Sequence, residues 1–181
     1  PLLIHPKTHR IHTSFSLNTA ATGRLSSINP NLQNIPIRTE NGKKIRKAFI
    51  ASKGHILLSA DYSQVELRLL AHFAKDSTML SAFKKGIDIH AQTASEIMGM
   101  RIEDVGPEDR SKAKAVNFGL MYGQSSFGLA EQLKISRGEA KDYINRYFER
   151  FGKIKGFLDT LKEAATTHGY STTLHGRKRF L

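Results

Sequence analysis

The sequence predicts an α+β fold, with short antiparallel strands near the two ends of the chain and helices through its middle. Polar and apolar residues alternate over residues 10–17, which is typical of a strand. From Ser63 the spacing of apolar residues becomes that of a helix, and further helical segments follow. Residues 170–174 and those from Arg177 onward have the pattern of a hairpin with His175-Gly176 at its turn. With 181 residues, the chain is about one domain long.

The first sixty residues combine strand patterns with a long segment of low periodicity. Residues 18–42 are rich in Asn, Thr, Ser, Gly and Pro, so we expect an irregular segment there, of the kind that is usually functional or a linker. Residues 48–51 and 56–60 flank Ser52-Lys53-Gly54-His55, which predicts a hairpin. We expect its second strand to present the carboxylate of Asp61 at the strand end.

The helix that begins near Ser63 carries its apolar residues in one stripe, formed by Val65, Leu69, Leu70 and Phe73. Shorter helices are expected over residues 78–84 and 89–98. Pro107 is typical of a first helical turn, and the helix that it opens should run to about residue 121.

Two further helices are predicted by their end signals. Ser136 and Glu139 have the spacing of a capping box, which predicts a helix that continues to about residue 151. Another helix is expected over residues 154–168, with Gly169 at its end.

Charge indicates a polyanionic partner. The chain has 28 Lys and Arg against 16 Asp and Glu, a net charge of +12, while 39% hydrophobic residues suffice for a core. The net charge is +8 over residues 1–60, −1 over residues 61–120 and +5 over residues 121–181. Positive ends around a neutral middle predict contacts with nucleic-acid phosphates, although a merely basic surface would have the same composition.

Several classes of protein are excluded or disfavoured. The chain has no cysteine, which excludes a disulfide scaffold and a thiolate metal site. Its apolar runs are too short to span a bilayer and no hydrophobic signal segment opens it, so we expect a cytoplasmic protein without a membrane contact. A nucleotide-binding G-x-x-x-x-G-K-[ST] loop is absent, which disfavours an ATPase or helicase. His5, His9 and His12 have helix-like spacing, but Pro6 disfavours a helix and hence a zinc site there.

Asp61 is the first candidate for chemistry, because a strand end holds a side chain rigidly enough for a metal ligand. Capping of the helix expected from Ser63 is the more ordinary role for an aspartate in this place. One carboxylate is also not a metal site by itself, since Mg²⁺ is usually held by one or two carboxylates together with substrate phosphates.

The second candidate is the helix after Pro107, where Arg110, Lys114, Phe118 and Tyr122 follow one another at intervals of four residues. This spacing places them along one face of the helix, with the cations toward its N-terminus and the aromatic rings toward its C-terminus. Such a face could hold a triphosphate at one end and stack a base at the other. A solvated basic turn followed by two core aromatics is the alternative.

Three segments resemble motifs of the family A (bacterial polymerase I-like) DNA polymerases. Residues 110–123, Arg-x₃-Lys-x₃-Phe-x₃-Tyr-Gly, resemble motif B, the fingers helix of that family. Residues 61–68, Asp-Tyr-Ser-Gln-Val-Glu-Leu-Arg, resemble motif A. Residues 22–27, Thr-Gly-Arg-Leu-Ser-Ser, with residues 30–36, Pro-Asn-Leu-Gln-Asn-Ile-Pro, resemble the primer–template segment.

The resemblance covers nearly the whole chain and implies a division into polymerase subdomains. Residues 1–72 would form part of a palm with short antiparallel strands, and residues 73–169 a mainly helical fingers subdomain. Residues 170–181 would form a truncated hairpin that returns toward the palm. The implied activity is template-directed DNA synthesis, in which two Mg²⁺ ions promote transfer of a deoxynucleotide to a primer 3′-OH.

The resemblance also implies roles for residues that would meet the incoming nucleotide. Asp61 would bind both Mg²⁺ ions, with the backbone carbonyl of Tyr62 as a further ligand. Glu66 would fill the space of a ribose 2′-OH and so select deoxyribose. Arg110 and Lys114 would hold the triphosphate, and Lys114 would also protonate the leaving pyrophosphate. The remaining contacts would be His90 to the triphosphate, Phe118 to the sugar and base, and Tyr122 to one side of the new base pair.

The implied partners are primer–template DNA and deoxynucleoside triphosphates, bound by a monomer. Arg24 would enter the minor groove at the primer terminus, where readout depends on the shape of the base pair. Gly123 would let the template approach, and the duplex nearby would contact Asn31, Gln33 and Asn34.

The sequence departs from the family in one important respect. The family's His-Asp-Glu turn, motif C, does not occur over residues 123–181. We therefore expect an incomplete polymerase that is inactive by itself. Two alternatives stay open. A non-catalytic DNA-binding module would not explain Asp61 and Glu66. Part of a single-subunit RNA polymerase should lack the sequence pattern Gln64-x-Glu66.

Overall fold

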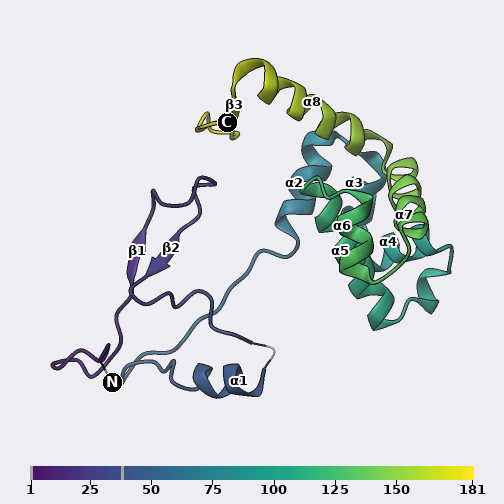
Figure 1. Cartoon of the computed structure of the whole chain (residues 1–181). Helices are drawn as coiled ribbons and strands as arrows, with labels where there is room; N and C mark the ends of the chain where they lie inside the picture. The colour runs from purple at the N-terminus through teal and green to yellow at the C-terminus, as the bar shows by residue number, and fades with distance from the viewer. Residues whose placement is uncertain (1, 38) are drawn as a thin grey trace. The chain divides into compact units, whose positions relative to one another are not determined.

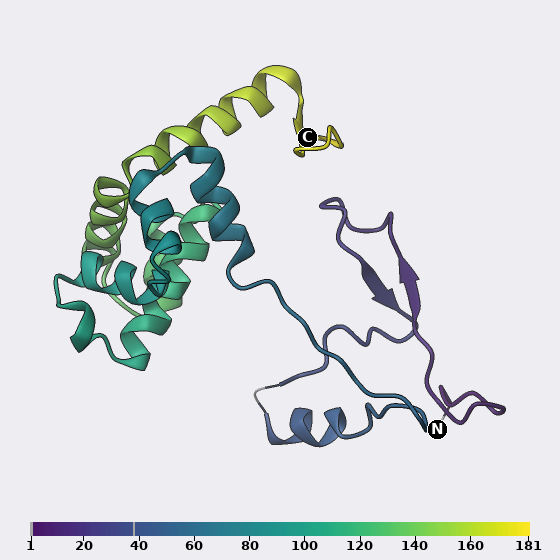
Figure 2. The same ribbon diagram turned by 180° about the vertical axis from the view of Figure 1, so that it is seen from behind.

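The computed structural model describes residues 2–37 and 39–181, which divide into two compact units (Figures 1 and 2). The first unit comprises Pro1–Asp61 with Thr172–Arg179, and the second comprises Tyr62–Ser171 with Phe180–Leu181. Two pairs of short antiparallel strands and a set of helices confirm the predicted α+β class.

The first unit contains a small hairpin of β1 (Ser14–Ser16) and β2 (Ser26–Ile28), in which Phe15 lies opposite Ser27. The strand predicted over residues 10–17 is therefore confirmed only in its second half. At the base of the hairpin, the Thr13 Oγ1 atom lies 2.7 Å from the Oγ atom of buried Ser27 and 2.8 Å from the carbonyl oxygen of Pro30. Side-chain hydrogen bonds thus hold this hairpin where apolar side chains are few.

The prediction that residues 18–42 are irregular is wrong in part, because they contain β2 and the beginning of α1 (Glu40–Arg46). Thr39 caps α1 by accepting a hydrogen bond from the Gly42 amide at 3.1 Å. Elements of three and seven residues are too short to establish an apolar period in the sequence.

The hairpin predicted over residues 48–60 is wrong, although its turn forms. The His55 amide donates to the Ser52 carbonyl at 3.0 Å, but no strand flanks this turn. Ile56, Leu57 and Leu58 are 87%, 67% and 87% exposed. A strand needs a neighbour to pair its amides and carbonyls, and no strand among the described residues lies beside this run. Asp61 consequently follows irregular chain and not a strand end.

The second unit is helical (Figure 2). Its elements are α2 (Val65–Ala74), α3 (Ser77–Lys84), α4 (Ile89–Met98), the 3₁₀ turn η1 (Ile102–Asp104), α5 (Pro107–Met121), α6 (Ser126–Leu133), α7 (Arg137–Arg150) and α8 (Gly152–His168). The predicted helices are confirmed within two residues at their ends, and Ser136 caps α7 by accepting from the Glu139 amide at 3.1 Å. Helix α6 was not predicted, since it is short and has Gly128 within it. None of the described helices is long and apolar enough to cross a membrane.

The core of this unit forms where the seven α-helices from α2 to α8 pack together. The apolar stripe predicted for α2 is wrong except for Leu70. Its buried residues are Leu67, Leu70, Ala71 and Ala74, whereas Val65, Leu69 and Phe73 are partly exposed. Both sets have helical spacing, and close packing selected the face that carries the two small alanines.

Asp76 joins three helices at one buried carboxylate. It follows α2, accepts a hydrogen bond from the Met79 amide at 3.0 Å to cap α3, and accepts another from the Lys153 amide of α8 at 3.3 Å. This acid therefore satisfies amides at the beginnings of two helices in the core.

The chain ends in the predicted hairpin. Gly169 closes α8 with φ of 72°, a left-handed conformation that favours glycine. Strands β3 (Tyr170–Thr172) and β4 (Lys178–Phe180) then pair with each other.

The buried hydroxyl of Tyr147 should lower the stability of this core, because it has no hydrogen-bond partner among the described residues. The side chain is fully buried. Burial, and to a smaller extent Asp76, raises the pKa of this phenol. We expect Tyr147→Phe to raise the free energy of unfolding by about 1 kcal/mol, because the orphan hydroxyl is removed at nearly constant shape. Urea denaturation would measure the change.

Tyr143→Phe on the same helix is the matched control, because the Tyr143 hydroxyl donates to Glu139 at 3.0 Å. It should leave stability unchanged or lower it slightly. A larger loss of stability in Tyr147→Phe than in Tyr143→Phe would contradict the prediction.

Candidate functional site

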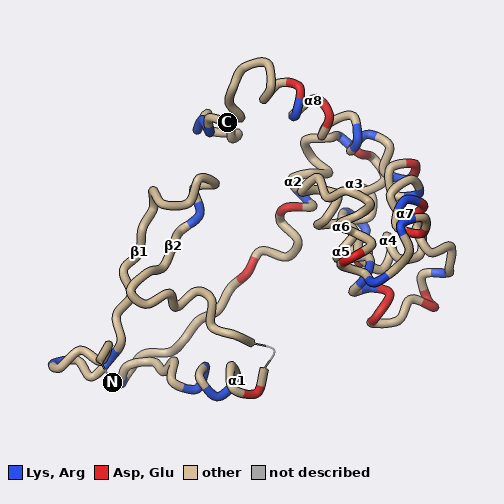
Figure 3. The backbone as a smooth tube through the Cα atoms, in the orientation of Figure 1, with Lys and Arg blue, Asp and Glu red and all other residues tan. Residues whose placement is uncertain are grey.

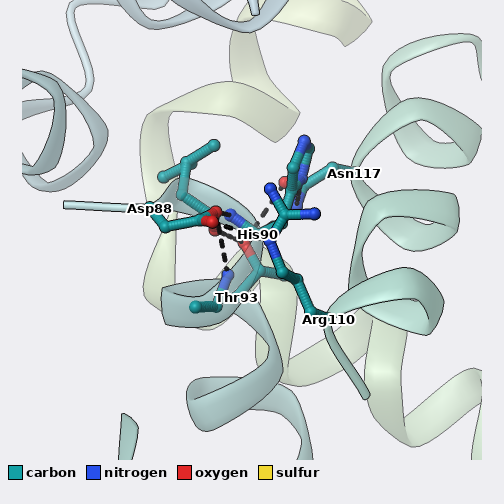
Figure 4. A network of polar contacts seen from close by, with 7 residues as sticks. Asp88, His90, Thr93, Arg110 and Asn117 are labelled. Atoms are coloured by element: carbon teal, nitrogen blue, oxygen red, sulfur yellow. Dashed lines mark hydrogen bonds and ion pairs between the residues drawn. The ribbon is translucent and has the colours of Figure 1, made fainter. Parts of the chain in front are cut away.

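The beginning of α4 and one face of α5 meet at a network of polar contacts that is buried at His90, Thr93 and Asn117 (Figure 4). Asp88 caps α4 by accepting from the amides of His90 at 2.9 Å and Ala91 at 3.3 Å. The other oxygen of the same carboxylate accepts from Arg110 Nε at 2.6 Å. Burial alone would raise the pKa of Asp88, but the hydrogen bonds from Arg110 and the two amides together lower it. Asp88 is therefore an ionised bridge between the two helices.

His90 is the buried member of the predicted triphosphate contacts, with 2% of its surface exposed. Its ring centroid lies 5.9 Å from that of Phe118, and its Nδ1 atom lies 3.2 Å from Asn117 Nδ2. Burial, followed by the charges of Arg110 and Lys114, lowers the pKa of His90 to about 4 despite the opposing charge of Asp88. The imidazole is thus neutral at neutral pH.

Asn117 was not singled out from the sequence, although it is central to the network. It is fully buried on α5 and contacts Thr93 Oγ1, the Ala113 carbonyl and His90. The buried residues of α5 are Ala113, Val116, Asn117 and Leu120, so an amide stands within an apolar face. That interruption was the available signal, because buried polar groups need partners.

The four residues of the predicted stripe lie as expected along α5 and its end. Arg110 is held by Asp88, whereas Lys114 is exposed and forms no ion pair with a described residue. Phe118 is half-buried, and Tyr122 at the C-cap is 65% exposed. The alternative of two core aromatics is therefore wrong for Tyr122.

Tyr122 also connects α5 to α2. Its hydroxyl donates to Glu66 Oε1 at 2.8 Å, which fixes the carboxylate in the first turn of α2 beside the end of the stripe. Gly123 follows with φ of 79°, which favours glycine, although a Cβ there would have open space. The structure thus brings together Glu66 with Tyr122, and His90 with Arg110 and Phe118.

Asp61 is exposed at the end of the first unit, and Tyr62 begins the second. The N-cap of α2 is Gln64, with φ of 52° and no capping side chain, so the alternative in which Asp61 caps this helix is wrong. Carboxylate and carbonyl oxygens are ligands of the kind that Mg²⁺ takes. Over residues 2–37 and 39–181, however, no cluster of three or more His, Cys, Asp or Glu could hold a metal ion.

The predicted DNA contacts Arg24, Asn31, Gln33 and Asn34 belong to the first unit and are exposed. The backbone here is held by side chains: Ser27 Oγ accepts from the Leu32 amide and Asn31 Oδ1 accepts from the Gln33 amide, both at 3.0 Å. Further along the unit, basic residues occupy the last turn of α1 (Figure 3), namely Lys43, Lys44 and Arg46. The unit thus presents amides and cations to solvent.

The low pKa of His90 predicts a pH dependence of stability. Between its ordinary pKa of 6.5 and the folded value of about 4, the unfolded chain binds a proton that the folded chain does not. The free energy of unfolding should therefore fall as the pH is lowered through this range, by up to about 3 kcal/mol from this group. Urea denaturation at several pH values would measure the slope, which His90→Gln should reduce. His72→Gln, at an exposed histidine, should keep it. Equal slopes in both variants would contradict the assignment.

Comparison with known proteins gives consistent matches. The family model "DNA polymerase family A" matches residues 1–181. A DNA polymerase I of Caldicellulosiruptor bescii is 53% identical over 98% of this chain and 21% of its own length. That of Pseudomonas aeruginosa is 51% identical over the whole chain and 20% of its own length.

Among solved structures, the polymerase domain of Pol1 from M. smegmatis, in complex with DNA primer–template and dNTP, matches with a TM-score of 0.89 and 45% identity. The match covers 99% of this chain and 32% of that chain. The chain thus spans about a fifth of the length of the curated relatives. With the family model matched from the first residue to the last and half of the residues shared with such relatives, the chain belongs to DNA polymerase family A.

Proposed function

We propose that this chain is part of the polymerase domain of a template-directed DNA polymerase, and that the exposed side of α5 binds the incoming deoxynucleoside triphosphate. The observation that carries the proposal is the order of side chains on that side. The cations Arg110 and Lys114 are followed by the rings of Phe118 and Tyr122. The Tyr122 hydroxyl donates a hydrogen bond to Glu66. This order matches a nucleotide, whose charge and base lie at opposite ends.

Arg110 and Lys114 would neutralise the phosphates, which is the main requirement of phosphoryl transfer. Lys114 is available without a competing ion pair among the described residues, whereas Arg110 would have to share or leave Asp88. His90 would add a neutral hydrogen-bond donor, and Lys114 would supply the proton to the departing pyrophosphate.

Glu66 and Tyr122 would select the sugar and enclose the base pair. The Tyr122 hydroxyl restrains the Glu66 carboxylate, so that a ribose 2′-OH would meet a fixed group and not a mobile one. Phe118 would lie against the sugar and base. Gly123, without a side chain, would leave room for the template.

The Asp61 carboxylate and the Tyr62 carbonyl would contribute oxygen ligands to magnesium. When bound, two ions would activate the primer 3′-OH and neutralise the leaving pyrophosphate. One carboxylate is too few, so further ligands would come from the triphosphate and from residues outside this sequence. The coverage of about a fifth of its relatives supports this incompleteness, as does the exposure of Ile56, Leu57 and Leu58, which a neighbouring segment would cover.

Primer–template DNA would contact Arg24, Asn31, Gln33 and Asn34 in the first unit, with Lys and Arg supplying charge. Under this proposal, residues 1–72 belong to the palm, residues 73–169 form the fingers and residues 170–181 form the hairpin that returns toward the palm. We also propose that the polymerase acts as a monomer in the cytoplasm, in replication or repair.

Lys114→Ala tests the triphosphate site against a plain DNA-binding module. In the complete polymerase that contains this segment, the KM for dNTP should rise about tenfold or more, because a charged hydrogen bond is lost. The Kd for primer–template should stay within twofold. Lys112→Ala is the matched control, because Lys112 lies on the same helix and pairs with Glu108 at 3.6 Å. Equal effects of the two variants on the KM for dNTP would refute the site.

Glu66→Ala tests the selection of deoxyribose and thus separates DNA from RNA synthesis. Ribonucleotide incorporation relative to deoxyribonucleotide should increase on the order of a hundredfold, since the excluding carboxylate is removed. Tyr122→Phe, which keeps the carboxylate and removes only its restraint, should have a smaller effect. Single-nucleotide primer extension gives both ratios, and unchanged discrimination in Glu66→Ala would show that the gate lies elsewhere.

A further inference from the structure

The contact between α4 and α5 buries three polar side chains, of which the proposed chemistry leaves Thr93 and Asn117 without a role. Thr93 and Asn117 are fully buried, and His90 is nearly so. Buried polar groups weaken a core unless their hydrogen bonds are satisfied, so the arrangement of donors and acceptors here is tightly constrained (Figure 4).

The Ala113 carbonyl fixes the orientation of the Asn117 amide. Asn117 Nδ2 lies 3.1 Å from this carbonyl oxygen, which can only accept a hydrogen bond. The reversed amide would place two oxygens against each other in a buried site. Thr93 is compatible with this orientation, because its hydroxyl donates to the Ile89 carbonyl at 2.8 Å and can accept from Asn117 Nδ2 at 3.0 Å, although it also lies 3.3 Å from Asn117 Oδ1.

The same Nδ2 group faces His90 Nδ1 at 3.2 Å, and its second hydrogen is shared between this ring nitrogen and Thr93 Oγ1, so Nδ1 acts as an acceptor. A proton on Nδ1 would point at an N–H group and leave both without an acceptor. The ring proton is therefore confined to Nε2, on the side of the imidazole that Asn117 does not occupy.

We propose that Asn117 is a positioning residue that holds His90 in its Nε2–H tautomer, so that the imidazole presents a neutral donor to the triphosphate. The inference rests on the proposed function of the α5 face. A neutral histidine can carry its proton on either ring nitrogen, and at His90 the Asn117 amide decides that this nitrogen is Nε2.

The charges around His90 agree with a neutral ring. Arg110 and Lys114 on α5 disfavour a second proton, and Asp88 on α4, which favours it, already has Arg110 as its partner. A neutral His90 can donate a hydrogen bond to the triphosphate without adding a third positive charge that Arg110 and Lys114 would repel. The opposite tautomer would present a lone pair to the phosphates instead.

Nitrogen-15 NMR of the histidine rings tests the tautomer directly in the 181-residue chain. The chain has eight histidines, and the signals missing from His90→Gln identify those of His90. At neutral pH the wild-type Nδ1 should resonate as an unprotonated nitrogen and Nε2 as a protonated one. A protonated Nδ1, in either the other tautomer or the imidazolium, would overturn the proposal, and this measurement needs no variant at Asn117.

Asn117→Leu removes the donor while keeping a side chain of similar size. Its His90 should show a mixture of tautomers, and in the complete polymerase the KM for dNTP should rise about tenfold with kcat within twofold. Thr93→Val is the matched control, since it removes a neighbour of Asn117 and leaves the bond to His90; its tautomer and KM should stay as in the wild type. A wild-type tautomer or an unchanged KM in Asn117→Leu would overturn the proposal.

Two measurements distinguish a missing triphosphate site from a missing role of Asn117. If Lys114→Ala leaves the KM for dNTP unchanged, the triphosphate site is refuted whatever the His90 spectrum shows. If Lys114→Ala acts as expected and the His90 spectrum shows a protonated Nδ1, only the role of Asn117 is refuted.

Discussion

The packing of α4 against α5 is the contact on which the candidate site depends. Helix α4 contributes Asp88 and His90, and α5 contributes Arg110, Asn117 and Phe118, so neither helix carries the site alone. The contact is held by polar groups as well as by apolar packing, and such groups stabilise only when their partners are correctly placed. A small shift between the helices would therefore disturb the donors and the cations together.

Asp88 links the stability of this contact to its electrostatics. One carboxylate oxygen caps α4 and the other holds Arg110, which places an anion beside the first cation of the stripe. Without it, the Arg110 guanidinium would lose its ion pair and its orientation along α5. With it, Arg110 is oriented beforehand, and a phosphate that reaches it must compete with a carboxylate already in place.

Prediction from sequence succeeded for helix ends, which depend on nearby residues of the chain. It failed for a strand and for a buried helix face, which depend on contacts with distant segments. Helices α4 and α5 begin and end as predicted because Asp88, Pro107 and Gly99 act through the backbone of their own segments. Residues 56–60 looked equally regular, but a strand exists only beside another strand, and none of the described residues provides one. The face of α2 was misassigned for a similar reason, since packing against other helices chose between two apolar stripes.

By itself, the sequence determined that Arg110, Lys114, Phe118 and Tyr122 share one side of a helix, because a spacing of four residues is a property of helical geometry. Its motifs likewise sufficed to indicate the family. Only the tertiary structure decided that Asp88 holds Arg110, that Asn117 faces His90 and that Tyr122 restrains Glu66. These contacts join residues 22, 27 and 56 positions apart, so they exist only once the helices have packed.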